Sequence, residues 1–126
     1  MTAAGSTLLF VYNADGTLPS LLVDAVHKLV SPRTYNCNLC RLTYGMARQK
    51  PAWKRFLTSL PVPAVFLHRD ELRARFPALA NASLPAVFIQ ESSGEPHPFV
   101  SADELNAVHD LDTLQALLTD RAASLA

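Results

Sequence analysis

The chain has 126 residues, of which 49% are hydrophobic and 17% are charged, and its 11 basic residues balance 11 acidic ones. A chain of this length buries about two-thirds of its unfolded surface, so it can form one core without disulfide or metal staples. Its net charge of zero gives no electrostatic basis for binding nucleic acid, and no apolar run reaches the roughly 18 residues of a membrane span. The N-terminus also lacks the basic and apolar regions of a secretion signal. We therefore expect a single cytoplasmic domain over residues 1–126, with no nucleic-acid or membrane partner.

The first predicted elements are a strand and a helix. Leu8–Tyr12 is a continuous apolar run that ends in the turn-forming sequence NADG, a pattern typical of a strand buried on both faces. From Leu18 onward, apolar residues recur at helical spacing. Pro19 lies in the expected first turn, and Ser31-Pro32 ends the helix.

The middle of the chain predicts alternating helices and strands. An amphipathic helix begins at Pro51, because its apolar residues recur at intervals of three and four: Trp53, Phe56, Leu57 and Leu60. The elements expected after it are a strand at Val62–His68, a short helix ended by Pro77, a strand at Leu84–Gln90, a hairpin loop, and an edge strand that contains Pro98.

The C-terminal segment predicts two helices separated by a break. Ser101 and Glu104 have the spacing of a capping box at the start of the first helix. The following leucines and valine recur at strict intervals of three, which on one straight helix drifts by about 60° per step. We therefore expect a break near His109-Asp110 and a second helix from Leu111.

This order of elements, together with the sequence SLPAVFI, resembles the thioredoxin/glutaredoxin fold over roughly Leu8 to Leu118. The resemblance implies an α/β fold with a central mixed sheet of about four strands flanked by helices, and a helical insert after the first helix, at about residues 32–60. It also implies a cis peptide bond before Pro85 at the start of a strand. Around the motif CNLC, the sequence is similar to a little-described bacterial group of thioredoxin-like proteins, some of them labelled GTPase. The chain has no Gly-x-x-x-x-Gly-Lys-[Ser/Thr] sequence, so its residues do not support that label.

Two arrangements of the strands remain open. In the favoured one, Leu8–Tyr12 is the central strand, and the cysteines lie in an insert that starts at the opposite end of the sheet from Pro85. In the other, Leu8–Tyr12 is an additional N-terminal strand, and SPRTYN replaces the central strand directly before the cysteines. That sequence is polar and contains Pro32, so it is a poor central strand.

Cys37 and Cys40, the two cysteines of the chain, form the candidate catalytic motif. A thiol at the start of a short helix has its thiolate stabilised by free N–H groups, and Arg41 adds positive potential. Cys37 would then attack a disulfide of the substrate and form a mixed disulfide with it, and Cys40 would resolve that mixed disulfide. Alternatively, Cys40 is a small buried residue, or the pair binds zinc with His27 nearby. Because structural zinc usually takes four ligands, the residues favour no metal, and we expect no cofactor.

A candidate binding site lies where the predicted parallel strands end. Tyr12, Asn13, His68, Leu84 and Pro85 fall at this edge, where ligands bind in open α/β sheets. Asn13, Arg69 and Asp70 also have routine roles in turns and helix caps. The leading hypothesis is a thiol–disulfide oxidoreductase that acts on protein thiols or a small thiol. The alternative is a non-catalytic binding domain on the same scaffold. The oligomeric state does not follow from the sequence.

Overall fold

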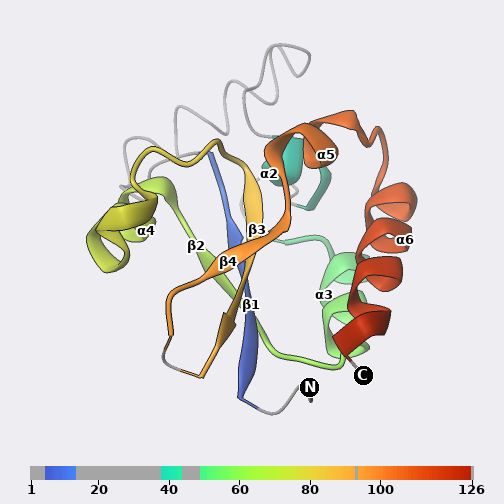
Figure 1. The fold of residues 1–126 in the computed structure, drawn as a ribbon. Coiled ribbons are helices and arrows are strands. Elements are labelled where there is room, and N and C mark those ends of the chain that lie inside the picture. Colours follow the sequence, from blue (N-terminus) through green and yellow to red (C-terminus); the bar gives the residue numbers. More distant parts are fainter. Residues whose placement is uncertain (1–4, 14–37, 44–48, 93, 126) are drawn as a thin grey trace.

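A computed structural model describes residues 5–13, 38–43, 49–92 and 94–125 (Figure 1). The helix expected from Leu18, together with His27 and Cys37, lies outside the described residues. None of the described helices is both long and apolar enough to span a membrane.

The described strands form one four-stranded mixed sheet, ordered β2-β1-β3-β4. Strand β1 runs parallel to β2 and antiparallel to β3, which in turn pairs antiparallel with β4. Their bounds are β1 Ser6–Val11, β2 Ala64–Leu67, β3 Ala86–Glu91 and β4 His97–Val100. Because β1 has a neighbour on each side, it is an interior strand of this sheet, as the favoured arrangement requires. The expected α/β fold with about four strands is confirmed at this level.

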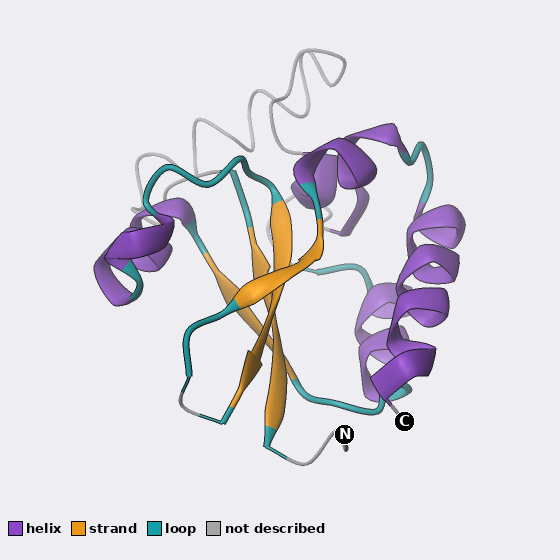
Figure 2. Ribbon diagram, in the orientation of Figure 1, coloured by secondary structure: helices purple, strands orange, loops and turns teal. Residues whose placement is uncertain are grey.

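Strand β1 is buried on both faces because successive side chains point to opposite sides of a sheet. Leu8, Phe10 and Tyr12 belong to one core cluster, whereas Leu9 and Val11 belong to the other. The first cluster is covered by the helices α2, α3, α5 and α6: Asn38–Thr43, Pro51–Thr58, Ala102–Ala107 and Leu111–Ala122. The second cluster is covered by α4 (Arg69–Arg75) and the 3-10 helix η2 (Pro77–Leu79). Figure 2 shows α3 and α6 on one side of the sheet and α4 on the other.

The C-terminal helices have the predicted capping box and the predicted break. The Glu104 backbone N–H donates to Ser101 Oγ at 3.2 Å, and the Ser101 N–H donates to Glu104 Oε1 at 3.0 Å. Helix α5 ends at Ala107. Helix α6 is capped by Asp110, whose Oδ1 accepts from the Thr113 N–H at 2.7 Å. The leucine spacing therefore indicated two helices correctly. The chain ends in a 3-10 helix, η3 (Ala123–Leu125).

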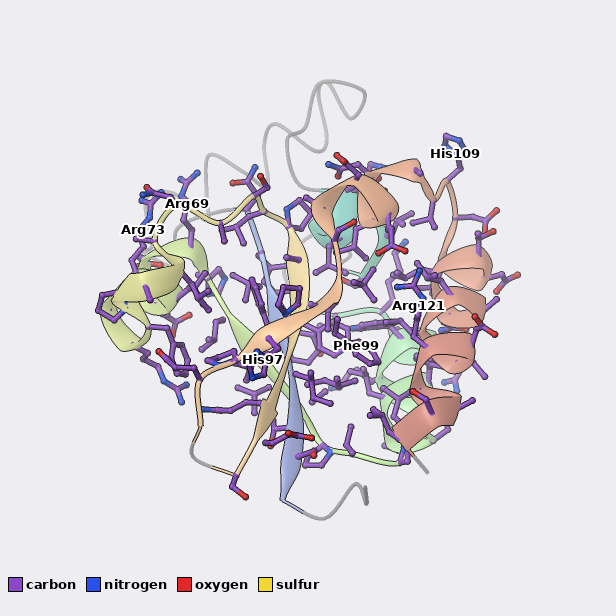
Figure 3. All side chains as sticks on the ribbon, in the orientation of Figure 1. Arg69, Arg73, His97, Phe99, His109 and Arg121 are labelled. Atoms are coloured by element: carbon purple, nitrogen blue, oxygen red, sulfur yellow. The ribbon has the colours of Figure 1, made fainter. Side chains whose placement is uncertain are left out.

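Arg121 links α6 to α5 and to the end of β4 (Figure 3). Its Nη1 donates to Glu104 Oε1 and to the Phe99 carbonyl, both at 3.2 Å, and its Nη2 pairs with Glu104 Oε2. The Arg121 hydrogen bond, followed by the Ser101 backbone N–H, lowers the pKa of Glu104 from 4.5 to about 2. Because the folded pKa lies below the unfolded one, this contribution to stability is complete above about pH 4.5 and is lost as the pH falls toward 2.

We expect Glu104→Gln to lower the free energy of unfolding at pH 7 by about 1 kcal/mol or less, because both side chains are about one-third exposed and water screens the pair. Urea unfolding at pH 7 and at pH 2 measures the effect, and the difference from the wild type should shrink at pH 2. Asp103→Asn, which changes an exposed carboxylate on the same helix, is the control. A difference of equal size at both pH values would refute this role for the ion pair.

Candidate functional site

The five residues predicted to bind a ligand lie at one edge of the sheet. In the sheet register, Val11 pairs with Leu67 of β2 and with Ala86 of β3. The residues just beyond that row are Tyr12, His68 and Pro85, and Asn13 and Leu84 adjoin them along the chain. Strand β1 therefore ends where β3 begins, and Figure 1 shows this edge at the top of the sheet. The sequence rule for parallel strands identified a real cluster of positions, although their role in binding stays a prediction.

Pro85 is buried at this edge, directly before β3. The Leu84–Pro85 peptide bond is cis, as the resemblance implied. Leu84 is half-buried and packs against the core cluster that contains Leu9 and Val11.

Tyr12 is part of the core beneath the edge, with only 1% of its surface exposed. Its ring stacks on Phe66 at a centroid distance of 5.8 Å and lies 5.7 Å from the His68 ring. Gln49 Nε2 donates to its hydroxyl at 3.2 Å. A ligand at this edge therefore meets His68, whose side chain is 26% exposed, before it meets Tyr12.

His68 is fixed by the helix that it caps. Glu71 Oε1 accepts from the His68 backbone N–H at 2.8 Å and lies 2.9 Å from the imidazole Nδ1. The backbone hydrogen bond from His68 is the largest factor that lowers the pKa of Glu71, followed by the side-chain hydrogen bond. The sequence suggested Arg69 or Asp70 as the cap, but the N-cap residue is His68. Arg69 instead donates from Nη1 to Asn13 Oδ1 at 3.3 Å and so joins the end of β1 to α4.

The short helix α2 carries the second cysteine of the motif, Cys40. Leu39 and Leu42 are buried in the same core cluster as Tyr12. Thr43, which is fully buried, donates from its hydroxyl to the Leu39 carbonyl at 2.7 Å, and its own carbonyl accepts from the Lys50 N–H at 2.8 Å. The two buried leucines therefore pack α2 against the core, and the Lys50 contact ties its last residue to the segment before α3.

Helix α2 lies beside α5, at the end of the sheet where β3 begins (Figures 1 and 2). Helix α5 is at this end because it follows β4, whose last residue Val100 pairs with Val87, two residues after Pro85. The sequence led us to expect an insert that starts at the opposite end of the sheet. Residues 32–37, where the insert would start, lie outside the described residues. The helical part of the insert that is described nevertheless lies at the Pro85 end.

Asn38, between the two cysteines, was not singled out by the sequence. Its Nδ2 donates to two backbone carbonyls of the α5 segment, those of Leu105 at 2.7 Å and Val108 at 2.8 Å. Its Oδ1 accepts from Arg41 Nε at 3.0 Å and from Arg41 Nη2 at 2.7 Å. The only sequence signal for this role is a polar side chain at the start of a helix that packs two leucines into the core.

Within the part of the chain that is described, no group of three or more histidine, cysteine or carboxylate residues is arranged to hold a metal ion. Comparison with protein-family models, curated proteins and solved structures gives no match.

Proposed function

We propose that the chain is a thioredoxin-like thiol–disulfide oxidoreductase that uses Cys37 and Cys40. The observation that carries this proposal is the location of α2, the helix of the motif, at the end of the sheet where Pro85 precedes β3. The strand order supports it, because the resemblance implies a mixed sheet of about four strands with Leu8–Tyr12 as the central strand, and β1 is an interior strand of such a sheet.

The reaction is an exchange of disulfide bonds. The Cys37 thiolate attacks one sulfur of a substrate disulfide, which forms a mixed disulfide and releases the other substrate sulfur as a thiolate. Cys40, deprotonated, then attacks the Cys37 sulfur and releases the second substrate thiolate. The substrate gains two electrons, the protein is left with a Cys37–Cys40 disulfide, and an external dithiol restores the reduced form.

Two features of the site suit this chemistry. The Arg41 guanidinium follows Cys40 directly in the sequence and is held on α2 by Asn38, so a fixed positive charge accompanies the motif. Positive charge near a cysteine stabilises the thiolate, which is the nucleophile. The half-buried His68 and the buried Pro85 supply a surface at the same end of the sheet for the substrate chain.

We expect one motif thiol, that of Cys37, to titrate below the ordinary cysteine pKa of about 8.5. The rate of iodoacetamide alkylation, measured from pH 4 to pH 10 with peptide mapping by mass spectrometry, reports this pKa for each cysteine. Cys37→Ser should remove the low-pH reactive phase, and Cys40→Ser should leave it in place. Two thiols with ordinary pKa values would overturn the proposed function.

A further inference from the structure

We propose that Asn38 is a positioning residue: its amide fastens the motif helix α2 to the end of α5 and holds the Arg41 guanidinium on the motif. The effect on thiol reactivity rests on the proposed function, whereas the fastening of α2 does not. Both parts follow from four hydrogen bonds between this side chain and other described residues.

The donor end of Asn38, its Nδ2, hydrogen-bonds backbone carbonyls that have no partner within their own helix. The last carbonyls of an α-helix have no partner within the helix, and they need one from elsewhere when they are buried. Helix α5 ends at Ala107, and Val108 continues in an extended conformation toward the exposed His109 (Figure 3). The two N–H groups of Asn38 reach the Leu105 and Val108 carbonyls at this point, 67 and 70 residues away in sequence. Asn38 therefore binds at the break between α5 and α6.

The acceptor end of Asn38 orients a charge. Arg41 lies three residues further along α2, and residues at this spacing are neighbours on a helix surface. Its Nε and Nη2 both donate to Asn38 Oδ1, so the half-buried guanidinium is held by two hydrogen bonds. The charge is thus fixed to the helix that carries Cys40.

An asparagine suits this position because it combines two donors with an acceptor. An aspartate would keep the contact with Arg41, but it would place a second oxygen against the Leu105 and Val108 carbonyls. An alanine would lose both contacts. The positions of α2, of the α5–α6 break and of the Arg41 charge are therefore coupled through one amide.

The test compares Asn38→Ala, Arg41→Met and the double variant with the wild type, with Asn106→Ala as a matched control on the exposed surface of α5. Deuterium uptake by the peptide that spans α2 reports the fastening, and the pH dependence of alkylation reports the thiol pKa. We expect Asn38→Ala to speed exchange in α2 about ten-fold or more. Arg41→Met and Asn106→Ala should leave exchange there near the wild-type rate.

We also expect Asn38→Ala and Arg41→Met to raise the pKa of the reactive thiol by similar amounts. The double variant should raise it no further than the larger single effect, because both changes act through the same guanidinium. Arg41→Lys should raise the thiol pKa less than Arg41→Met does, because lysine keeps the positive charge but loses the two-point contact with Asn38.

Three results would overturn parts of the proposal. Wild-type exchange in Asn38→Ala would show that the amide does not fasten α2. An unchanged thiol pKa in Asn38→Ala, alongside a raised one in Arg41→Met, would show that Asn38 does not hold the charge. Ordinary pKa values for both wild-type thiols would remove the proposed function and the reactivity part together, while the exchange measurement would still decide the fastening.

Discussion

Cys40→Ser should trap a mixed disulfide between Cys37 and a disulfide-containing peptide when no external thiol is present, and the pre-reduced variant should not release the second peptide thiol in a single turnover. The first attack needs only the Cys37 thiolate, whereas release of the substrate needs the second thiol. Without Cys40 the covalent intermediate therefore accumulates. Intact-mass spectrometry after an acid quench measures the adduct.

The matched variant is Cys37→Ser, which should form no adduct and should also be inactive. The two serine variants thus differ in their products although neither releases both peptide thiols. Equal adduct formation in both variants would show that the cysteines have no fixed order of attack, contrary to the roles proposed for them. Release of both peptide thiols by either pre-reduced variant without an external thiol would contradict the exchange mechanism.

Trp53→Ala should lower the free energy of unfolding by about 3–5 kcal/mol, a large part of the stability of a typical domain. Trp53 is 0% exposed and belongs to the core cluster of β1. Its ring meets Phe10 edge-on at a centroid distance of 5.6 Å and stacks on Phe56 at 5.7 Å. Removal of the indole leaves a cavity between α3 and the sheet. Urea denaturation followed by far-UV circular dichroism measures the loss.

Trp53→Phe is the informative comparison. Among the described residues the buried indole Nε1 has no hydrogen-bond partner, so phenylalanine keeps much of the ring volume and removes a donor that these residues leave unsatisfied. We expect it to cost less than about 1.5 kcal/mol, the usual limit for hydrophobic exchanges of similar volume. If Trp53→Ala cost less than about 1 kcal/mol, or if both variants were equally damaging, the ring would not be the main contact between α3 and the sheet.

Local patterns in the sequence predicted the features that depend on neighbours along the chain. The apolar run Leu8–Tyr12 indicated an interior strand, and β1 is buried on both faces. The Ser101–Glu104 spacing indicated a cap, and the leucine spacing indicated the break after α5. The placement of Tyr12 and His68 at one edge followed from strand direction, because the carboxyl ends of parallel strands share one edge. Pro85 lies at the same edge because β3 runs antiparallel to β1 and begins where β1 ends.

Contacts between distant segments were not predictable in this way. The location of α2 depends on Asn38, whose hydrogen-bond partners in α5 lie 67 and 70 residues further along. The cap of α4 was missed because histidine is not among the preferred N-cap residues, although Glu71 completes the capping box. The core position of the Tyr12 ring and its hydrogen bond from Gln49 were likewise not evident from the sequence, and its role in binding stays a prediction. These outcomes depend on packing between elements rather than on any local pattern.

The most direct test of the proposed function is the redox equilibrium of the two thiols. The full chain is equilibrated in dithiol/disulfide buffers of stepped potential, alkylated, and analysed by mass spectrometry. We expect a single two-electron transition between the dithiol and an intramolecular Cys37–Cys40 disulfide, with a midpoint between about −270 and −120 mV, the range of known dithiol catalysts. A pair that stays reduced at every potential, or that forms only intermolecular disulfides, would contradict the proposal.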